Sequence, residues 1–389
     1  MNSDSLRVGV DASNIRAGGG VTHLAELLKA AEIRSEGIAK VTVWGGKDTL
    51  NCLPRHSWLH LQHERELDGP LLRRLAWQRT KLTVLAKESC DVLFVPGGSY
   101  TGSFRPFITM AQNQLLFESH ERQRYRFSRV NLRLKILKKT QHSTFRRAAG
   151  VIFLTNTTRQ IVERRLGPSG KHVVIPHGIN PSFCRAPRNQ QFASSYSATR
   201  PFRFLYVSIV DLYKHQWHVV EAVAELRARG IAVELELVGP SYPPALRRLR
   251  KAIGKFDPQG QFIHYRGPAA NGDLVKQYQE ADAFIFASSC ESFSLVLVDA
   301  MAAGLPIACS NRSVLPEVLA GAGIYFDPEQ PHEIARALES LIGDSSLREH
   351  YSRLSYERSQ LYSWDRCAQQ TFSFITAVAR AAEEKNKVK

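Results

Sequence analysis

Two stretches of the chain each alternate short apolar runs with amphipathic segments, and this alternation constrains the fold more than any other feature. In the first stretch, runs of strand length cover residues 7–10, 41–44, 92–95, 107–111, 150–154 and 173–175. In the second stretch they cover residues 203–207, 233–238, 262–265, 283–286, 306–309 and 323–326, with helices expected notably at 216–229, 274–280 and 331–342. Alternation of this kind is typical of βα units and parallel sheets. We therefore predict an α/β protein with two doubly wound parallel sheets.

The length and a polar segment between the stretches predict two domains. A chain of 389 residues is long for a single hydrophobic core. Residues 184–201 are polar, rich in Ser and Arg, and without periodicity, which indicates a linker. The expected parts are a first domain at 1–183, this linker, a second domain at 202–364, and a helix with a charged tail at 365–389. Ligands of such folds bind at the carboxyl ends of the strands, in a cleft that the two domains would face.

Composition narrows the class of protein. The formal net charge of +16 favours an anionic partner: nucleic acid, an acidic membrane surface or an anionic substrate. The start of the chain lacks the pattern of a signal peptide, and no apolar run approaches the roughly 20 residues that cross a bilayer. Six cysteines are scattered without metal-finger spacing, at positions 52, 90, 184, 290, 309 and 367. We expect reduced thiols in a cytoplasmic protein, and neither a disulfide framework nor a zinc site.

The segment Glu291–Pro306 carries most of the functional information. A buried-type strand at 283–287 is followed by a Ser-rich turn and a helix that Ser292 or Ser294 would cap, ending near Ala303 before Gly304 and Pro306. The first backbone N–H groups of that helix, at Phe293, Ser294 and Leu295, would attract a phosphate. Asp299 lies two helical turns beyond Glu291, roughly 12 Å along the axis. The spacing alone fits a second interpretation equally well, in which Glu291 caps the helix and Asp299 is a solvated surface residue.

The residues SSCESFSLVLVDAMAAGLPIACS resemble the signature of retaining glycosyltransferases of family GT4, which have the GT-B fold. The resemblance implies that Glu291 contacts the transferred sugar and Asp299 the ribose of a nucleotide sugar. It also implies that backbone groups near Phe293–Val296 bind the distal phosphate. Two residues depart from the family pattern: Asp299 replaces the usual Glu, and Ser294 stands where Gly is common.

Further segments resemble the same family in the expected order. YVSIVDLYKHQWHVVEAV resembles the element with the diphosphate-binding lysine, here Lys214. Many members have Arg five residues earlier, where this chain has Ile209; Arg266 or His215 are the candidate substitutes. LELVGP and YRGP resemble loops beside the nucleotide base, which implicates Gly239 and Arg266 in donor binding.

The first half contains weaker candidates. Gly18, Gly19 and Gly20 follow a strand and precede a helix expected at 21–28, but the Gly spacing of dinucleotide-binding proteins is absent. By resemblance, Gly19 and Gly20 approach the donor, unless the loop is simply flexible. FITMAQNQLLFESH resembles a strand and loop that faces the acceptor, which suggests Asn113 on the acceptor side and His120 as a catalytic-side residue.

Residues 121–147 combine many cations with apolar residues at helical spacing. Val130, Leu134 and Leu137 keep that spacing among ten Lys and Arg residues, with Arg73, Arg74, Arg79 and Lys81 as a possible extension. We predict a basic amphipathic helix suited to an anionic membrane surface, with a solvated basic face as the alternative. No nucleic-acid-binding signature accompanies it.

The resemblance thus implies a metal-independent retaining glycosyltransferase without cofactor. Its donor would be a nucleotide sugar, UDP- or GDP-linked, and its acceptor a hydroxyl of a saccharide or lipid-linked saccharide in envelope polysaccharide or O-antigen synthesis. The catalytic groups would be Glu291, Lys214 and His120. The alternatives are a nucleotide-sugar epimerase of similar fold and a catalytically inactive membrane scaffold. We also expect the C-terminal helix to pack back on the first domain.

Overall fold

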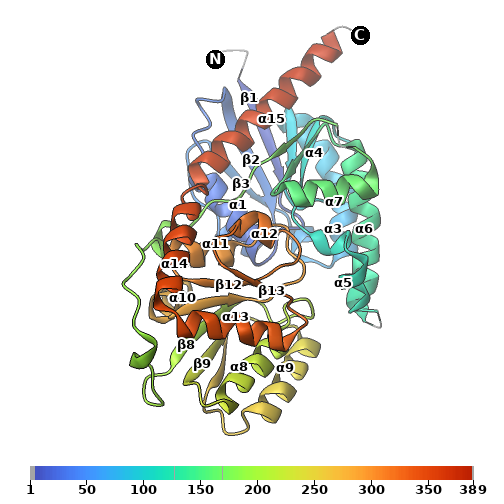
Figure 1. Cartoon of the computed structure of the whole chain (residues 1–389). Coiled ribbons are helices and arrows are strands. Elements are labelled where there is room, and N and C mark those ends of the chain that lie inside the picture. Colours follow the sequence, from blue (N-terminus) through green and yellow to red (C-terminus); the bar gives the residue numbers. More distant parts are fainter. Residues whose placement is uncertain (1–4, 127, 169, 388–389) are drawn as a thin grey trace. The chain divides into compact units, whose positions relative to one another are not determined.

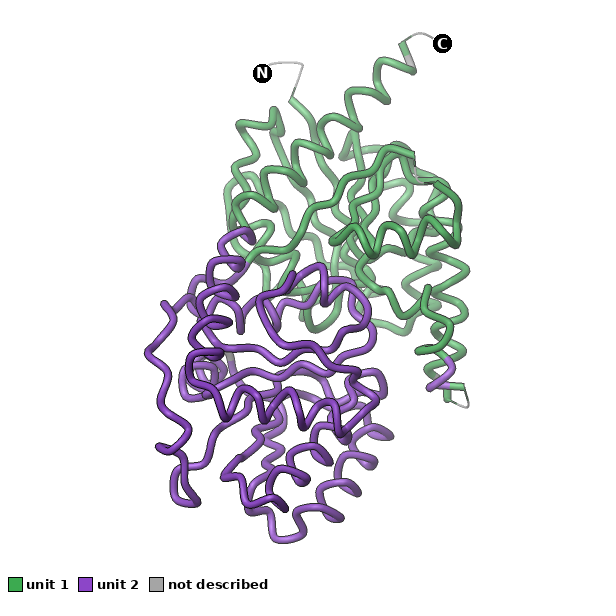
Figure 2. The backbone as a smooth tube through the Cα atoms, in the orientation of Figure 1, with its two compact units in different colours: residues 1–122, 126–178, 363–389 green, residues 123–125, 179–362 purple. Residues whose placement is uncertain are grey.

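The computed structural model describes residues 5–126, 128–168 and 170–387, which form two compact units. Unit 1 contains residues 1–122, 126–178 and 363–389, and unit 2 contains residues 123–125 and 179–362 (Figure 2). The chain therefore leaves unit 1 after Gly178 and returns to it at Ser363. Among the described residues, no helix is both long enough and apolar enough to cross a membrane.

Unit 1 is built on a parallel sheet with the strand order β3-β2-β1-β4-β5-β6-β7 (Figure 1). The strands are β1 (Leu6–Asp11), β2 (Ile38–Gly45), β3 (Leu59–His63), β4 (Val92–Val95), β5 (Phe107–Ala111), β6 (Gly150–Phe153) and β7 (His172–Val174). The predicted strands of the first half are confirmed, and β3 is an addition. β3 has the sequence LHLQH at the edge of the sheet, with only Leu59 buried, so it lacks the apolar run that marks the central strands.

Helices cover both faces of this sheet, and the C-terminal helix is one of them. They are α1 (Gly19–Lys29), α2 (Lys47–Asn51), α3 (Leu71–Arg79), α4 (Lys81–Ser89), α5 (Ser119–Gln123), α6 (Arg129–Arg147), α7 (Asn156–Leu166) and α15 (Trp364–Lys387). Helix α15 packs against α1, β4 and β6, which confirms the expected return of the C-terminal helix to the first domain. The basic segment forms α5 and α6 instead of one helix, and the Ser128 side chain caps α6 by accepting from the N–H of Asn131.

Unit 2 contains the second parallel sheet, with the strand order β10-β9-β8-β11-β12-β13. Its strands are β8 (Phe202–Val207), β9 (Val233–Val238), β10 (Ile263–Gly267), β11 (Ala283–Phe286), β12 (Ile307–Ser310) and β13 (Ile324–Phe326). Its helices are α8 (Gln216–Ala228), α9 (Pro243–Phe256), α10 (Asn271–Glu280), α11 (Leu295–Ala302), α12 (Leu315–Leu319), α13 (Pro331–Gly343) and α14 (Ser345–Ser359). The chain builds outward from β8 on one side and then resumes at β11 on the other. Strands β8 and β11 therefore flank the topological switch point, where α/β sheets bind ligands.

The segment predicted as a linker lies against unit 2. The Arg185 N–H donates to the Ala302 carbonyl at 2.9 Å. The fully buried guanidinium of Arg348 on α14 donates to the carbonyls of Ile342 and Gln191, so it joins this segment to the body of the unit. A buried cation bonded only to carbonyls and amides binds neighbouring segments together through several directional contacts. These contacts attach the segment to unit 2 at Arg185 and Gln191, although most residues from 185 to 200 are exposed.

Candidate functional site

The central pair of the candidate site lies at the switch point of unit 2. Lys214 follows β8 and Glu291 follows β11, and these strands are neighbours in the sheet. The Lys214 Nζ forms an ion pair with the Glu291 Oε1, and the two side chains are only 7% and 15% exposed. The Nζ also lies 4.9 Å from the ring centroid of Phe286 on β11. The topology thus brings together two residues that the sequence separates by 77 positions.

Hydrogen bonds fix the loops that carry this pair. The Tyr206 hydroxyl donates to the Lys214 carbonyl at 2.5 Å, and the Ser289 N–H donates to the Tyr213 carbonyl at 2.8 Å. The Ser313 hydroxyl, which follows β12, accepts from the Glu291 N–H and donates to the Glu291 carbonyl, both at 2.9 Å. Loops from three adjacent strands therefore hold Lys214 and Glu291 in a defined geometry, as a preorganised site requires.

Helix α11 begins beside this pair, at a strained residue. Ser294 occupies the N-cap position with φ 115° and ψ 90°, a backbone conformation that favours glycine. Its hydroxyl is buried, makes no capping hydrogen bond and has no hydrogen-bond partner among the described residues. The prediction that a serine side chain caps this helix is therefore wrong for Ser294. Backbone strain of this kind clusters at functional sites.

Near Ser294, the candidate groups for ligand binding are the backbone N–H groups at the start of α11, because the Phe293 side chain is buried. The Phe293 side chain is 2% exposed and packs edge-on against Tyr362, with the ring centroids 5.3 Å apart. Leu295 is the first residue of α11. The first N–H groups of a helix have no partner within the helix, and the helix dipole adds partial positive charge there. The start of α11, shortly after the Glu291 that pairs with Lys214, is therefore a candidate anion site.

Asp299 lies on α11, where it is half-buried. Burial raises the pKa of its carboxyl group to about 8, although the N–H of Asn180 favours the charged form. This shift favours the protonated carboxyl group at neutral pH, which can donate one hydrogen bond and accept others. Donors and acceptors of this kind suit the hydroxyl groups of a sugar or ribose. Its predicted contact with ribose stays a prediction.

Gly239 allows a close backbone contact between the loops that follow β9 and β8. It follows β9 with φ 140°, and a Cβ atom on it would lie 2.1 Å from the carbonyl oxygen of Ser208. Its N–H donates to the Gly267 carbonyl at 2.8 Å, and its carbonyl accepts from the Tyr265 hydroxyl at 2.9 Å. Only glycine allows this approach to the backbone at the start of the loop that leads to Lys214.

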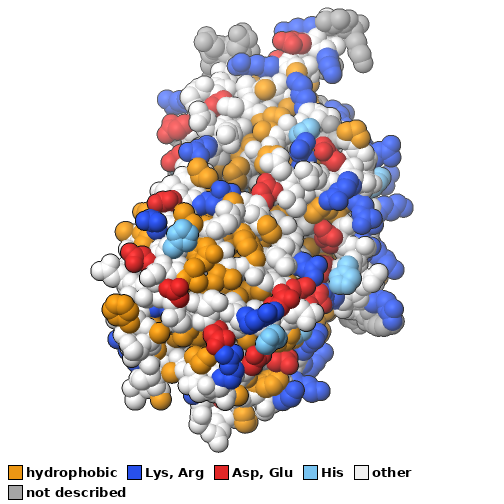
Figure 3. All heavy atoms as spheres, viewed as in Figure 1, with side chains coloured by type: hydrophobic (Ala, Val, Ile, Leu, Met, Phe, Trp, Pro, Cys, Tyr) orange, Lys and Arg blue, Asp and Glu red, His pale blue; other side chains and the backbone are white. Residues whose placement is uncertain are grey.

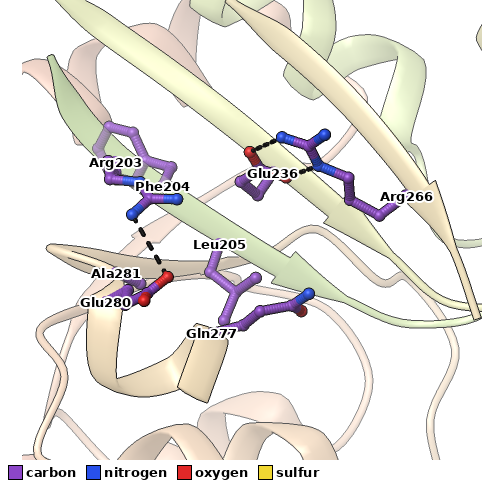
Figure 4. A pocket seen from close by; sticks show the side chains of 8 residues that line it. All are labelled: Arg203, Phe204, Leu205, Glu236, Arg266, Gln277, Glu280 and Ala281. Atoms are coloured by element: carbon purple, nitrogen blue, oxygen red, sulfur yellow. Dashed lines mark hydrogen bonds and ion pairs between the residues drawn. The ribbon is translucent and has the colours of Figure 1, made fainter. Parts of the chain in front are cut away.

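Arg266 lies beside a cavity of about 190 Å³ on β8, β9 and α10 (Figure 4). Its guanidinium donates two hydrogen bonds of 2.8 Å to the Glu236 carboxylate. Arg203, which forms an ion pair with Glu280 at 3.6 Å, lines the same cavity (Figure 4). The charges around this cavity are thus paired with one another. The predicted role of Arg266 in donor binding remains a prediction.

His215 does not supply the positive charge of the arginine that the family resemblance leads us to expect at the position of Ile209. His215 is fully buried at the start of α8, and its Nε2 lies 2.9 Å from the Ser289 hydroxyl. Burial lowers the pKa of His215 to about 2, so the ring is neutral. Ile209 itself is an exposed apolar residue. Among the two proposed substitutes, His215 therefore supplies no positive charge.

Two residues that the sequence did not single out flank the Lys214 loop. The Tyr125 hydroxyl donates to Asp211 Oδ1 at 2.5 Å, and the same oxygen accepts from the Leu212 N–H at 2.7 Å. Tyr125 belongs to the short segment 123–125 that is part of unit 2. Burial raises the pKa of Asp211. No sequence signal links a tyrosine at 125 with this loop, because the contact depends on the fold alone.

The predicted residues of unit 1 lie in two connections of its sheet, one after β1 and one after β5. Gly19 and Gly20 are the first two residues of α1, which begins two residues earlier than the sequence predicts. Asn113 is exposed after β5, and His120 is exposed on α5 with its Nδ1 3.4 Å from Glu121. The roles assigned to these four residues stay predictions.

A buried polar network supports the loop before α1, and the sequence did not reveal it. The Gln78 Nε2 donates to the buried carboxylate of Asp11 at 2.6 Å, and the Arg74 Nη1 donates to the Ser13 carbonyl at 2.7 Å. Arg74 is only 4% exposed. The suggestion that Arg74 extends a basic surface is therefore wrong, since its charge is used inside the unit.

Comparison with known proteins finds a family model that matches part of unit 2. Residues 187–358 match the family model of the glycosyl transferases group 1. Over 112 residues the chain is 33% identical to the O-antigen chain mannosyltransferase B of Escherichia coli, an alignment that covers 29% of each protein. The chain spans between 29% and 53% of the length of three curated relatives that it matches.

Solved structures share the fold over nearly the whole chain. Sucrose-phosphate synthase from Thermosynechococcus elongatus superposes with a TM-score of 0.74 at 17% identity, covering 99% of this chain and 100% of that one. Anabaena HepE in complex with UDP and glucose gives a TM-score of 0.70 at 18% identity, covering 94% of this chain and 98% of that one. The predicted fold, two Rossmann-like domains of the GT-B type, is confirmed.

Proposed function

From the match of residues 187–358 to the family model of the glycosyl transferases group 1, we propose that the protein is a glycosyltransferase that uses a nucleotide-diphosphate sugar. The observation that carries the proposal is the buried pair of Lys214 and Glu291 beside the start of α11. The acceptor is a hydroxyl group of a saccharide or lipid-linked saccharide, in envelope polysaccharide or O-antigen synthesis. The similarity to an O-antigen mannosyltransferase supports this choice of pathway.

In the proposed reaction, these groups stabilise the departing nucleoside diphosphate. The bond between the anomeric carbon and the diphosphate oxygen breaks, and negative charge develops on the distal phosphate. Lys214 and the first N–H groups of α11 would bind that charge, and the low exposure of the Lys214 and Glu291 side chains supports this role. The acceptor oxygen forms the new bond to the anomeric carbon, and its proton passes to the departing diphosphate oxygen.

The remaining groups position the donor. Glu291, held through Ser313, accepts hydrogen bonds from the hydroxyl groups of the transferred sugar, and Asp299 contacts the ribose. We infer from the family resemblance that the anomeric configuration is retained and that no metal or other cofactor takes part. The base is uracil or guanine in this proposal, and HepE, a structural relative, has been solved with UDP and glucose.

Donor screening tests the proposal directly. UDP-, GDP-, ADP- and dTDP-sugars are added to the purified protein while thermal unfolding and release of nucleoside diphosphate are measured. The correct donor, at 100 times its Kd, stabilises the folded state by about 2.7 kcal/mol. Lys214→Ala should lower kcat by roughly 10²–10³-fold, as removal of one preorganised charge-stabilising group does. Lys276→Ala, which changes a lysine 73% exposed on α10, serves as the matched control.

Three outcomes would contradict the proposal. A panel in which no nucleotide sugar stabilises the protein or reacts would exclude the activity. Equal turnover by the Lys214→Ala and Lys276→Ala variants would remove Lys214 from the site. Conversion of a donor into its epimer without an acceptor would assign the protein to the epimerases instead.

We further propose that the outer face of α6 adsorbs to an anionic membrane surface, near a lipid-linked acceptor. Lys and Arg side chains gather along the edge of unit 1 that carries α6 and α7 (Figure 3). Exposed cations of this region are Arg126, Arg133, Lys135, Lys138, Lys139 and Arg146, whereas Phe127 lies outside the described residues. Each cation near an anionic bilayer contributes about 1 kcal/mol.

The apolar side of α6 is used for packing inside unit 1. Leu134 and Phe145 are 5% and 8% exposed, so they are not available for insertion into lipid, whereas Leu132 is 64% exposed. Binding should therefore be mainly electrostatic and should weaken strongly at high salt. Cosedimentation with phosphatidylglycerol vesicles should fall in a Lys138→Glu/Lys139→Glu variant. A Lys251→Glu/Lys255→Glu variant on α9 has the same net charge and should bind like the wild type; equal losses in both variants would contradict a specific surface.

A further inference from the structure

Unit 1 contains a buried cluster of three metal-ligating side chains, separate from the groups considered so far. His23 lies on α1, His177 lies three residues beyond β7, and Cys367 lies in the first turn of α15. Their exposed fractions are 0%, 6% and 2%. One ligand atom from each lies within 4.8 Å of the other two. Helices α1 and α15 contact each other in unit 1, so residues far apart in the sequence meet at this cluster (Figure 1).

The imidazole of His23 is the unusual member of the cluster. Neither of its ring nitrogens has a hydrogen-bond partner among the described residues, although the ring is completely buried. Burial lowers the pKa of His23 to about 3, so the ring is neutral and one nitrogen keeps its lone pair. A buried polar atom without a partner costs about 1–3 kcal/mol and calls for an explanation such as a bound ion.

The aromatic rings of the cluster pack closely together. The ring centroids of His23 and His177 are 4.5 Å apart, with 41° between the planes. Trp364 packs against both imidazoles, at 5.9 and 5.6 Å between centroids, and closes the cluster with an apolar surface. Bond lengths of 2.0–2.3 Å in tetrahedral geometry place ligand atoms roughly 3.3–3.8 Å apart. The three side chains would need to close by only about 1 Å.

We propose that His23, His177 and Cys367 bind one thiophilic cation, Zn²⁺ or Cu⁺. Two imidazoles with a thiol suit these soft or borderline ions, whereas Mg²⁺ and Ca²⁺ prefer oxygen ligands, which this set does not contain. The Cys367 thiol would lose its proton on binding, since the thiolate is the ligand. A fourth position remains open for Zn²⁺, and three ligands suffice for Cu⁺.

The ion would act as a structural clamp in unit 1. The chain leaves the unit after Gly178 and re-enters it at Ser363. These two stretches lie backbone to backbone, because a Cβ on Gly178 would lie only 2.1 Å from the N atom of Trp364. The cluster thus joins the last residues before the exit, the first helix after the return, and α1. No step of the proposed sugar transfer depends on the ion, so the inference stands apart from that function.

Metal analysis of the untagged full-length protein tests the clamp. The protein is purified without chelator, its zinc and copper are measured by mass spectrometry, and metal-free protein is titrated with Zn²⁺ or, under reducing conditions, with Cu⁺. We expect one equivalent per chain and a rise in Tm with one of the two ions. Cys367→Ser and His23→Gln should lose the ion. Cys90→Ser, which changes another buried cysteine of unit 1, is the control and should keep it.

The clamp is refuted if the metal-free wild type takes up neither ion, or if Cys367→Ser binds as much metal as the wild type. Should a variant fail to fold, uptake and the Tm shift of the wild type still decide. Metal-free protein kept below its Tm should retain sugar transfer. Failure of the clamp and failure of the proposed function are therefore distinguishable.

Discussion

The strained serine at the start of α11 gives the sharpest prediction about stability. In Ser294→Gly, the backbone keeps φ 115° and ψ 90° without the Cβ that makes this conformation costly. Release of the strain contributes about 1–3 kcal/mol. Removal of the buried hydroxyl, which has no partner among the described residues, contributes about 1–3 kcal/mol more. The extra flexibility of glycine in the unfolded chain costs about 0.5–1 kcal/mol.

With the lower half of each range, the two gains minus the cost of glycine flexibility predict that Ser294→Gly raises the free energy of unfolding by about 2 kcal/mol. In a domain of 150–250 residues this corresponds to a rise in Tm of about 4–8 °C. Ser294→Ala removes the hydroxyl and keeps the Cβ, so it should gain only about 1 kcal/mol. Scanning calorimetry of the three proteins separates the backbone contribution from the hydroxyl contribution.

Ser313 supplies a matched control at the same site. It also has positive φ, at 62°, but its hydroxyl is bonded to both backbone groups of Glu291. Ser313→Gly therefore relieves strain and loses two hydrogen bonds, each worth about 1 kcal/mol, so it should be no more stable than the wild type. The reasoning is refuted if Ser294→Gly unfolds at a lower temperature than the wild type, or if Ser294→Ala is as stable as Ser294→Gly.

Three further variants test other parts of the account. The raised pKa of Asp299 means that the folded state keeps a proton that the unfolded state releases, so the free energy of unfolding should fall as the pH rises from 4 to 8, by up to about 1.4 kcal/mol per pH unit. Urea unfolding of Asp299→Asn should show a flatter dependence of this free energy on pH, and a slope equal to that of the wild type would count against the shift. Gly239→Ala forces a methyl group against the Ser208 carbonyl and should cost about 3 kcal/mol; a Tm equal to that of the wild type would disprove the close approach. Arg74→Met should destabilise unit 1 by about 2 kcal/mol, whereas the exposed neighbour Arg73→Met should be neutral, and equal effects would contradict the buried network.

The sequence predicted the two sheets because their central strands are apolar on both faces. Strands such as 92–95 and 283–286 are completely buried, so their composition alone marks them. The edge strand Leu59–His63 alternates with polar residues and escaped notice. The unit boundary at Gly178 depends on packing between distant segments, which local composition does not encode.

The candidate site shows the same division. Lys214 and Glu291 could be named because each lies in a recognisable segment, but their ion pair follows from the adjacency of β8 and β11. The conformation of Ser294 is invisible in the sequence, since serine rarely adopts positive φ and only its unusual place in the family pattern hinted at it. Likewise, His23 and Cys367 are 344 positions apart, so spacing rules for metal sites could not find them.

The central claim is that a nucleoside diphosphate binds between Lys214 and the start of α11. A crystal structure with the nucleoside diphosphate that emerges from the donor screen tests it most directly. The account predicts the distal phosphate within hydrogen-bonding distance of the Lys214 ammonium and the N–H groups that begin at Ser294. A diphosphate bound instead in the cavity between Arg203 and Arg266, with the Lys214–Glu291 pair undisturbed, would contradict it.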